Sequence, residues 1–166
     1  MASTYEPIAS TTLGSNSNSV TLSSIPQTFT DLIAVWDFAL SGASNNVRLR
    51  MGNSSVDTGN NYSGTYVLGS GSIAVSSRRS NIPSFYLADA GNLGTGRVVI
   101  VSSIMSYANT NVYKTVLAQC ASPGVLVSRD VGLWRSTSAI DVIEFISAGY
   151  DFVSGSTFSL FGVKAA

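Results

Sequence analysis

The sequence predicts an all-β protein whose strands form an antiparallel β-sandwich in a single domain. Three observations lead to this fold class. Runs rich in Val, Ile, Thr, Phe and Tyr recur about every 10–15 residues, and clusters of Gly, Ser, Asn and Pro separate them. Several runs alternate apolar and polar residues, the period of two that a half-buried strand requires. No stretch of about 12 residues carries apolar side chains at helical spacing, so we expect under about a tenth of the chain in helix.

Each predicted strand is a run of this kind that ends at residues favouring a turn, as where Ile25-Pro26 closes the second run. In chain order, the predicted strands are Glu6–Ala9, Ser19–Ser24, Asp31–Leu40, Asn46–Met51, Gly64–Leu68, Ser84–Ala88, Arg97–Tyr107, Tyr113–Ala121, Gly124–Trp134, Ile140–Ser147 and Thr157–Lys164.

Alternation along the early strands predicts which side chains are buried. Between Val47 and Met51 the apolar residues share one face of the strand, whereas Arg48 and Arg50 share the other. The run Ser19–Ser23 alternates in the same way. We interpret both as strands with one face against the core and one face toward solvent.

Other strands are apolar on both faces. The runs Leu32–Trp36 and Val98–Val101 contain almost no polar residue, and the final strand places Phe158 and Leu160 on one face but Phe161 on the other. Such strands are expected at the centre of a sheet, covered on one side by the opposite sheet. We expect a neighbouring subunit to cover the second side.

Two polar stretches, Asn53–Ser63 and Gly69–Asn81, are predicted to be long exposed loops. No change in composition marks a second domain, so residues 1–166 are assigned to one β-sandwich domain. Residues 1–18 are expected to form a partly extended N-terminal arm.

Uncharged hydroxyl groups replace charges in this chain. Hydrophobic residues make up 45% of it, but charged residues only 11%, against about 25% in an ordinary soluble domain. There are 29 Ser and 13 Thr, and the 9 basic residues balance the 9 acidic ones. Copies of a chain with no net charge repel one another weakly, so we expect a homo-oligomer whose surface is largely covered by other subunits.

The charge pattern argues against nucleic acid and membrane as partners. Nucleic-acid binding needs a basic stripe, whereas the adjacent basic pair Arg78-Arg79 is interpreted as part of a solvated loop. No apolar run reaches the ~18 residues needed to cross a bilayer. The segment Met1–Glu6 has neither a basic nor an apolar region, so we expect no signal peptide and synthesis in a cytoplasm.

Residues for catalysis or for holding a metal are scarce. There is no histidine, which excludes Ser-His-Asp and Cys-His catalysis and any His-containing zinc site. The single cysteine, Cys120, is interpreted as a small buried apolar residue. Asp141 and Glu144 have opposite parity on a strand, whereas Asp31 and Asp37 share parity but lie about 20 Å apart. We therefore expect no enzyme, no cofactor and no metal site.

Five segments resemble a widespread group of small virion surface proteins of tailed bacteriophages: Tyr5–Ala9, Ile25–Leu32, Ser106–Thr115, Val131–Ile140 and Gly155–Ala165. Proteins of that group resemble jelly-roll modules that decorate the head or form fibre and tail-tip domains. The resemblance implies a jelly-roll type of sandwich and a location in the virion. It also favours a homotrimer over a dimer, and it implies no catalytic residue.

The resulting prediction is a non-enzymatic structural protein of the virion, assembled in the host cytoplasm. The first hypothesis is a capsid decoration (cement) protein that contacts the major capsid protein or another virion protein. The alternative is a tail-fibre or receptor-binding domain whose aromatic side chains recognise carbohydrate of the host surface. Aromatic and arginine side chains are enriched at protein interfaces, and on that basis the candidate interface residues are Trp134, Arg135, Tyr107, Tyr113, Trp36 and Phe161.

Overall fold

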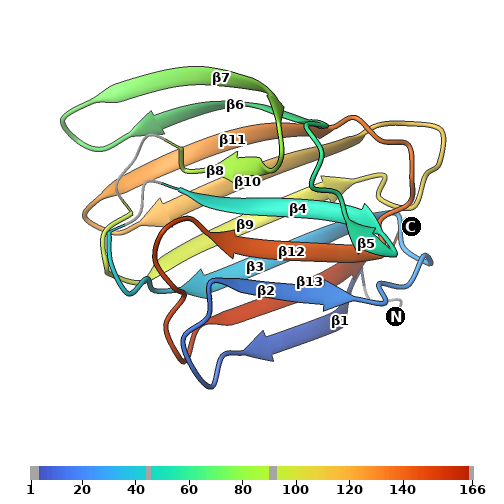
Figure 1. Ribbon diagram of the computed structural model, residues 1–166, viewed down its shortest axis with the longest axis horizontal. Coiled ribbons are helices and arrows are strands. Elements are labelled where there is room, and N and C mark those ends of the chain that lie inside the picture. The colour runs from blue at the N-terminus through green and yellow to red at the C-terminus, as the bar shows by residue number, and fades with distance from the viewer. Residues whose placement is uncertain (1–3, 44–45, 90–92, 165–166) are drawn as a thin grey trace.

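A computed structural model, which describes residues 4–43, 46–89 and 93–164, confirms the antiparallel β-sandwich. Figure 1 shows two layers of strands, the smaller one lying in front of the larger. The described residues contain no helix of the length and apolarity that a membrane crossing requires. In sheet order, the large sheet consists of β1 (Tyr5–Thr12), β13 (Thr157–Val163), β3 (Asp31–Phe38), β9 (Val98–Met105), β10 (Lys114–Ser122), β11 (Leu126–Trp134), β6 (Tyr62–Gly69) and β7 (Ala74–Ile82).

The small sheet has five strands, all antiparallel to their neighbours. It is ordered β2 (Ser19–Ser23), β12 (Val142–Ser147), β4 (Val47–Asn53) and β5 (Ser55–Val56), and β8 (Phe85–Leu87) pairs with β4 on the same edge as β5, opposite β12. The side chains between the two sheets form one hydrophobic core.

Aromatic rings fill the middle of this core. Trp36 of β3 meets Phe145 of β12 edge to face, with ring centroids 4.6 Å apart. Phe158 of β13 contacts Phe145 at 5.2 Å and Phe152 at 4.9 Å. All of these rings are buried, so they join the two sheets through close and specific aromatic contacts.

One aromatic ring is seated where glycines replace side chains on the facing sheet. A β-carbon on Gly132 would lie 2.4 Å from Phe85 Cε2, and one on Gly64 would lie 2.7 Å from the same atom. Gly132 and Gly64 are register partners on β11 and β6, so the two form a socket for Phe85 of β8. This socket lets β8 approach the large sheet closely.

Every predicted strand overlaps an observed one, but the two predicted loops were wrong in part. The stretch Gly69–Asn81 contains most of β7, an edge strand that pairs with β6 along its length. The stretch Asn53–Ser63 contains β5 and the first residues of β6. β7 was predicted to be a loop because its sequence is largely polar. A strand can nevertheless form there, because pairing with β6 uses backbone groups and needs no apolar side chains.

The N-terminal segment is an integral part of the large sheet. Of the residues predicted to form an arm, 1–3 lie outside the described residues, and β1 pairs with β13 from Tyr5↔Val163 to Thr12↔Thr157. β1 is thus an edge strand, which corrects the prediction of an arm. The final strand, β13, lies between β1 and β3, as its two apolar faces predicted.

Candidate functional site

The outer face of the large sheet is the candidate site, and the strand register defines it. Side chains alternate between the two faces of a strand, so every second residue of each strand points away from the core. On the five central strands β3, β9, β10, β11 and β6, pairing aligns these residues into four rows. We call the twenty positions the outer face: Asp37–Val99–Ala121–Val127–Gly69, Val35–Val101–Gln119–Arg129–Val67, Ile33–Ser103–Leu117–Val131–Thr65 and Asp31–Met105–Thr115–Leu133–Ser63.

Large apolar side chains concentrate on this face although solvent reaches them. Val127 is 63% exposed, Val67 54%, Val131 49% and Leu117 45%. Val99, Val101 and Met105 are exposed as well, and Ile33, Val35 and Leu133 are half-buried. Single exposed apolar residues are ordinary, but a contiguous apolar patch on a sheet marks a surface that contacts something else.

Charged groups are few on the outer face and lie toward its two sides. Asp37 of β3 forms an ion pair with Arg97 at 2.6 Å, and Asp31 Oδ1 accepts a hydrogen bond from the backbone N–H of Ser106 at 2.6 Å. Arg129 of β11 is exposed, and in the described part of the chain no group pairs with its guanidinium. The acidic side chains therefore lie on β3, whereas the basic one lies three strands away.

The outer face is hollowed next to β7. A shallow groove of about 500 Å³ runs over β6, β7 and β11, and its lining includes Val67, Gly69, Gln119, Val127 and Arg129. A β-carbon on Gly69 would meet nothing within 4 Å, so this position is an open notch in the face. The groove offers aliphatic surface with one cation and one amide, which suits packing against another surface better than enclosing a small molecule.

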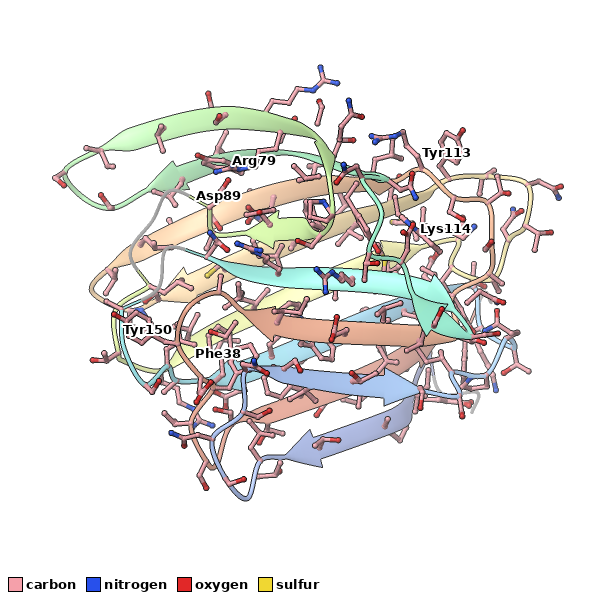
Figure 2. The ribbon with its side chains drawn as sticks, in the orientation of Figure 1. Phe38, Arg79, Asp89, Tyr113, Lys114 and Tyr150 are labelled. Carbon is pink, nitrogen blue, oxygen red and sulfur yellow. The ribbon has the colours of Figure 1, made fainter. Side chains whose placement is uncertain are left out.

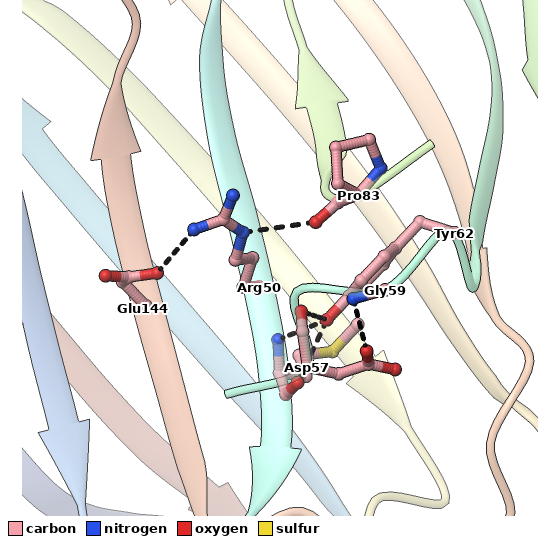
Figure 3. A network of polar contacts seen from close by, with 7 residues as sticks. Arg50, Asp57, Gly59, Tyr62, Pro83 and Glu144 are labelled. Atoms are coloured by element: carbon pink, nitrogen blue, oxygen red, sulfur yellow. Dashed lines mark hydrogen bonds and ion pairs between the residues drawn. The ribbon is translucent and has the colours of Figure 1, made fainter. Parts of the chain in front are cut away.

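The outer face of the small sheet is different in chemistry. Arg50 donates to Glu144 at 3.3 Å and to the carbonyl oxygen of Pro83 at 3.1 Å (Figure 3). Arg48 lies over the ring of Tyr86, with its guanidinium carbon 4.4 Å from the centroid. Charged and polar groups on this side satisfy one another, as the alternation between Val47 and Met51 predicted.

Buried ionisable groups lie on the inner face of the large sheet. Asp130 of β11 accepts hydrogen bonds from Ser128 Oγ at 2.7 Å and from the Ala88 N–H at 3.2 Å, and burial raises its pKa to about 6. Asp89, also buried, forms an ion pair with Arg79 (Figure 2). The space beside Asp89 and Arg79 measures about 10 Å³, room for roughly one water molecule, so it has no place for a substrate.

Lys114 is a further buried ionisable residue. Its ammonium donates to the carbonyl oxygens of Asn109, Val112 and Thr137, which ties two loops at the end of β10 together. Burial lowers the pKa of Lys114. Because backbone carbonyls take up all three donors, this lysine is structural and presents no free cation to a ligand.

The interpretation of Cys120 as a small buried residue is confirmed, whereas the interpretation of the Arg78-Arg79 pair is only partly correct. Cys120 is buried, and burial raises the pKa of its thiol to about 12, so the thiol is unreactive. In the described ranges, no cluster of three or more His, Cys, Asp or Glu side chains could hold a metal ion. Arg78 and Arg79 are exposed, as predicted, but they lie on β7 and not in a loop; Arg79 also pairs with Asp89 and lies over the Tyr86 ring at 4.8 Å.

The predicted interface residues are dispersed rather than gathered into one site. Trp36 and Tyr107 are fully buried and Trp134 is 2% exposed, so these three belong to the interior and are removed from the surface that a partner could reach. Trp134 stacks on Tyr62 at 6.4 Å and donates to Asp57 Oδ2 at 2.7 Å, so it holds the loop after β5.

The other three candidates have partial or full exposure. Tyr113 is 53% exposed at the loop end of β10 (Figure 2). Arg135 is half-buried and donates to the carbonyl oxygen of Asn60 at 2.7 Å and to Asn81 Oδ1 at 2.9 Å. Phe161 is half-buried on the outward side of β13, beside the outer face. Residue type alone missed the outward valines of β11, although their alternation was visible in the sequence.

Comparisons with known proteins add little to this description. No family model matches the chain, and no curated protein sequence matches it. Among solved structures, it is similar to CG-16, a homodimeric agglutinin from chicken liver, with 15% sequence identity and a TM-score of 0.39. The matched region covers 85% of this chain and 99% of that one. We draw no functional conclusion from a similarity of this size.

Proposed function

We propose that this protein is a non-enzymatic structural subunit that packs into a larger assembly through the outer face of its large sheet. The concentration of exposed aliphatic side chains on that face is the observation that supports the proposal most directly. A free monomer would leave these side chains in water at a cost of about 25 cal/mol for each Å². Contact with another protein surface removes that cost.

Within this class, our proposal is a surface protein of a bacteriophage particle, first of all a capsid decoration (cement) protein. The resemblance of Tyr5–Ala9, Ser106–Thr115 and Val131–Ile140 to small virion proteins supports it, as does the low content of charge. A cement protein needs many weak and identical contacts instead of a deep pocket. An extended, nearly uncharged sheet face is suited to such contacts.

The alternative, a receptor-binding domain for host carbohydrate, rests on exposed aromatic side chains. Tyr5, Tyr113 and Tyr150 are exposed, but Tyr62, Tyr107 and Trp134 are buried and have no free ring face for a sugar. The decoration role is therefore our first choice. Copy number separates the two, because a decoration protein is present in hundreds of copies per head and a fibre protein in about a dozen.

The test of the function uses particles that lack this protein. Deletion of the gene is expected to give heads that leak under heat or osmotic shock but adsorb normally to host cells. Adding back the purified protein should restore the heads, whereas the variant Val131→Glu should not, because it places a charge in the outer face. Ser23→Glu, on the exposed outer side of β2, is the matched control and should restore them. Intact heads that fail to adsorb would reject the decoration role.

A further inference from the structure

We infer that the outer face binds a second copy of this chain, sheet against sheet, with a two-fold axis that runs along the strands between β9 and β10. The inference rests on the function proposed above and names the first partner of the same face. It proposes a dimer in place of the homotrimer that the resemblance to virion proteins favoured. Three properties of the face support it: its size, the alternation of large and small side chains across the proposed axis, and the placement of its charges.

The size of the face matches that of a stable interface. Five strands about 4.8 Å apart and seven residues of about 3.3 Å each give a footprint of about 24 by 23 Å. Including the flanking strands β13 and β7 raises the footprint to roughly 770 Å². A specific interface of standard size buries about 800 Å² on each partner. Together with the flanking strands β13 and β7, the outer face is therefore about large enough to hold a second copy.

The residues nearest the axis are complementary in size. A two-fold axis along the strands places β9 of one copy over β10 of the other and keeps each row opposite itself. Ser103 then faces Leu117 of the second copy, and Val99 faces Ala121 of the second copy. A larger side chain meets a smaller one in both rows, which is the arrangement that lets two sheets interdigitate about 10 Å apart.

The charges are complementary under the same operation. The axis places β11 of one copy over β3 of the other, because these strands lie at equal distances from it. Arg129 then lies over Val35 of the second copy, one outward position, or about 7 Å, from Asp37. An arginine side chain spans that distance. The unpaired guanidinium of each copy therefore reaches a carboxylate, which it shares with Arg97 of the second copy, and the contact is formed twice.

The absence of net charge means that two copies of the chain do not repel each other through their overall charge. Two identical chains repel in proportion to the square of their net charge, which is zero at pH 7. A two-fold pair closes on itself and leaves the small sheets and the loops on the outside. In that arrangement the polar groups around Arg50 and Glu144 face solvent.

The first experiment measures mass in solution at micromolar concentration by light scattering and by sedimentation. The wild-type chain is expected to have about twice the monomer mass of 17.3 kDa. Leu117→Glu places two carboxylates next to the axis and should raise the dissociation constant of the dimer at least about 100-fold. Ser23→Glu, which lies on the other sheet, should leave the constant unchanged. A monomeric or a trimeric wild-type protein overturns the inference.

A charge exchange tests the orientation of the two copies. Arg129→Glu and Asp37→Lys are each expected to weaken the dimer about tenfold, and the double variant should recover most of the affinity. Circular dichroism and melting temperature confirm that all three variants are folded. Failure of the double variant to recover, with folding intact, would rule out the proposed axis.

Failure of this inference can be told apart from failure of the proposed function. If the wild-type chain is monomeric but Leu117→Glu no longer restores leaking heads, the outer face binds a different protein of the particle. The inference is then wrong and the proposed function stands. If Leu117→Glu restores heads as well as the wild-type chain does, the outer face has no role in assembly, and the function proposed for it is wrong too.

Discussion

The two sheets of this sandwich have the same construction but opposite outer surfaces. On the small sheet, outward positions carry Arg48, Arg50 and Glu144, which pair with one another or with neighbouring polar groups. On the large sheet, half of the twenty outer-face positions carry Val, Leu, Ile or Met, and solvent reaches these side chains. Since the inner faces of both sheets share one core, burial within the chain cannot explain the difference. This difference supports the proposal that the outer face of the large sheet packs against another protein.

Strand β11 shows the contrast most sharply, because its pattern is inverted. Its inward positions include Ser128 and Asp130, whereas its outward positions include Val127 and Val131. Inward polar groups are hydrogen-bonded to each other, which makes their burial possible. Within a single chain, no comparable contact accounts for the outward position of the valines. Such a strand is therefore more informative about partners than a strand with ordinary alternation.

The largest expected effect compares two aromatic residues of β13. Phe158 is fully buried between the sheets, and Phe158→Ala should lower the free energy of unfolding by about 3–5 kcal/mol. Phe161 points outward, and Phe161→Ala should cost about 1 kcal/mol or less in the monomer. Urea unfolding at submicromolar concentration measures both. Equal losses would mean that the outer face is part of the core, which would remove the basis of the comparison.

The second effect concerns the inverted pattern of β11 and depends on pH. The folded-state pKa of Asp130, about 6, lies above the ordinary value of 3.8, so the folded chain binds more protons than the unfolded chain between these values. Stability should therefore fall as pH rises from about 4 to about 6, by roughly 3 kcal/mol in total. Asp130→Asn should remove this contribution. An identical pH profile for the variant would show that another group titrates.

The third effect tests the buried cation on the inner side of β10. Lys114→Met keeps the apolar stem but leaves the carbonyl oxygens of Asn109, Val112 and Thr137 without their donor. A loss of about 2–3 kcal/mol is expected, because unpaired buried polar groups are costly. Thermal melting measures it, and Lys114→Arg provides a control that keeps the charge. A melting temperature of Lys114→Met equal to that of the wild-type chain would mean that water replaces the ammonium.

The smallest effect is on the outer side of the small sheet. Glu144→Gln removes the charge from the pair with Arg50, whose side chains are partly exposed. The expected loss is below about 1 kcal/mol, and it should shrink further at high salt. Urea unfolding at low and high ionic strength checks this. A loss of several kcal/mol would show that this pair, although it faces outward, supports the fold.

Much of the fold could be predicted from the sequence, because a strand with one apolar face shows alternating apolar and polar residues, as between Val47 and Met51. The edge strand β7 could not, since Ser, Arg and Asn fill its middle from Ser76 to Asn81 and its strand conformation depends on pairing with β6. The candidate functional site was harder to predict than the fold. Trp134 and Tyr107 were chosen by residue type, but a large aromatic side chain is suited to a core as well as to an interface. Parity relative to Leu126 would have directed attention to Val127 and Val131 instead.

The socket of Phe85 has a consequence for how this sequence can change over time. Phe85 occupies the volume that β-carbons on Gly64 and Gly132 would require. The side chains at these three positions therefore cannot all be large. A substitution at either glycine becomes acceptable only after the ring has been replaced by something smaller, and a smaller residue at 85 leaves a void until a glycine gains a side chain. Mutations at these three sites are therefore expected to be inherited in a fixed order, with the change at position 85 first.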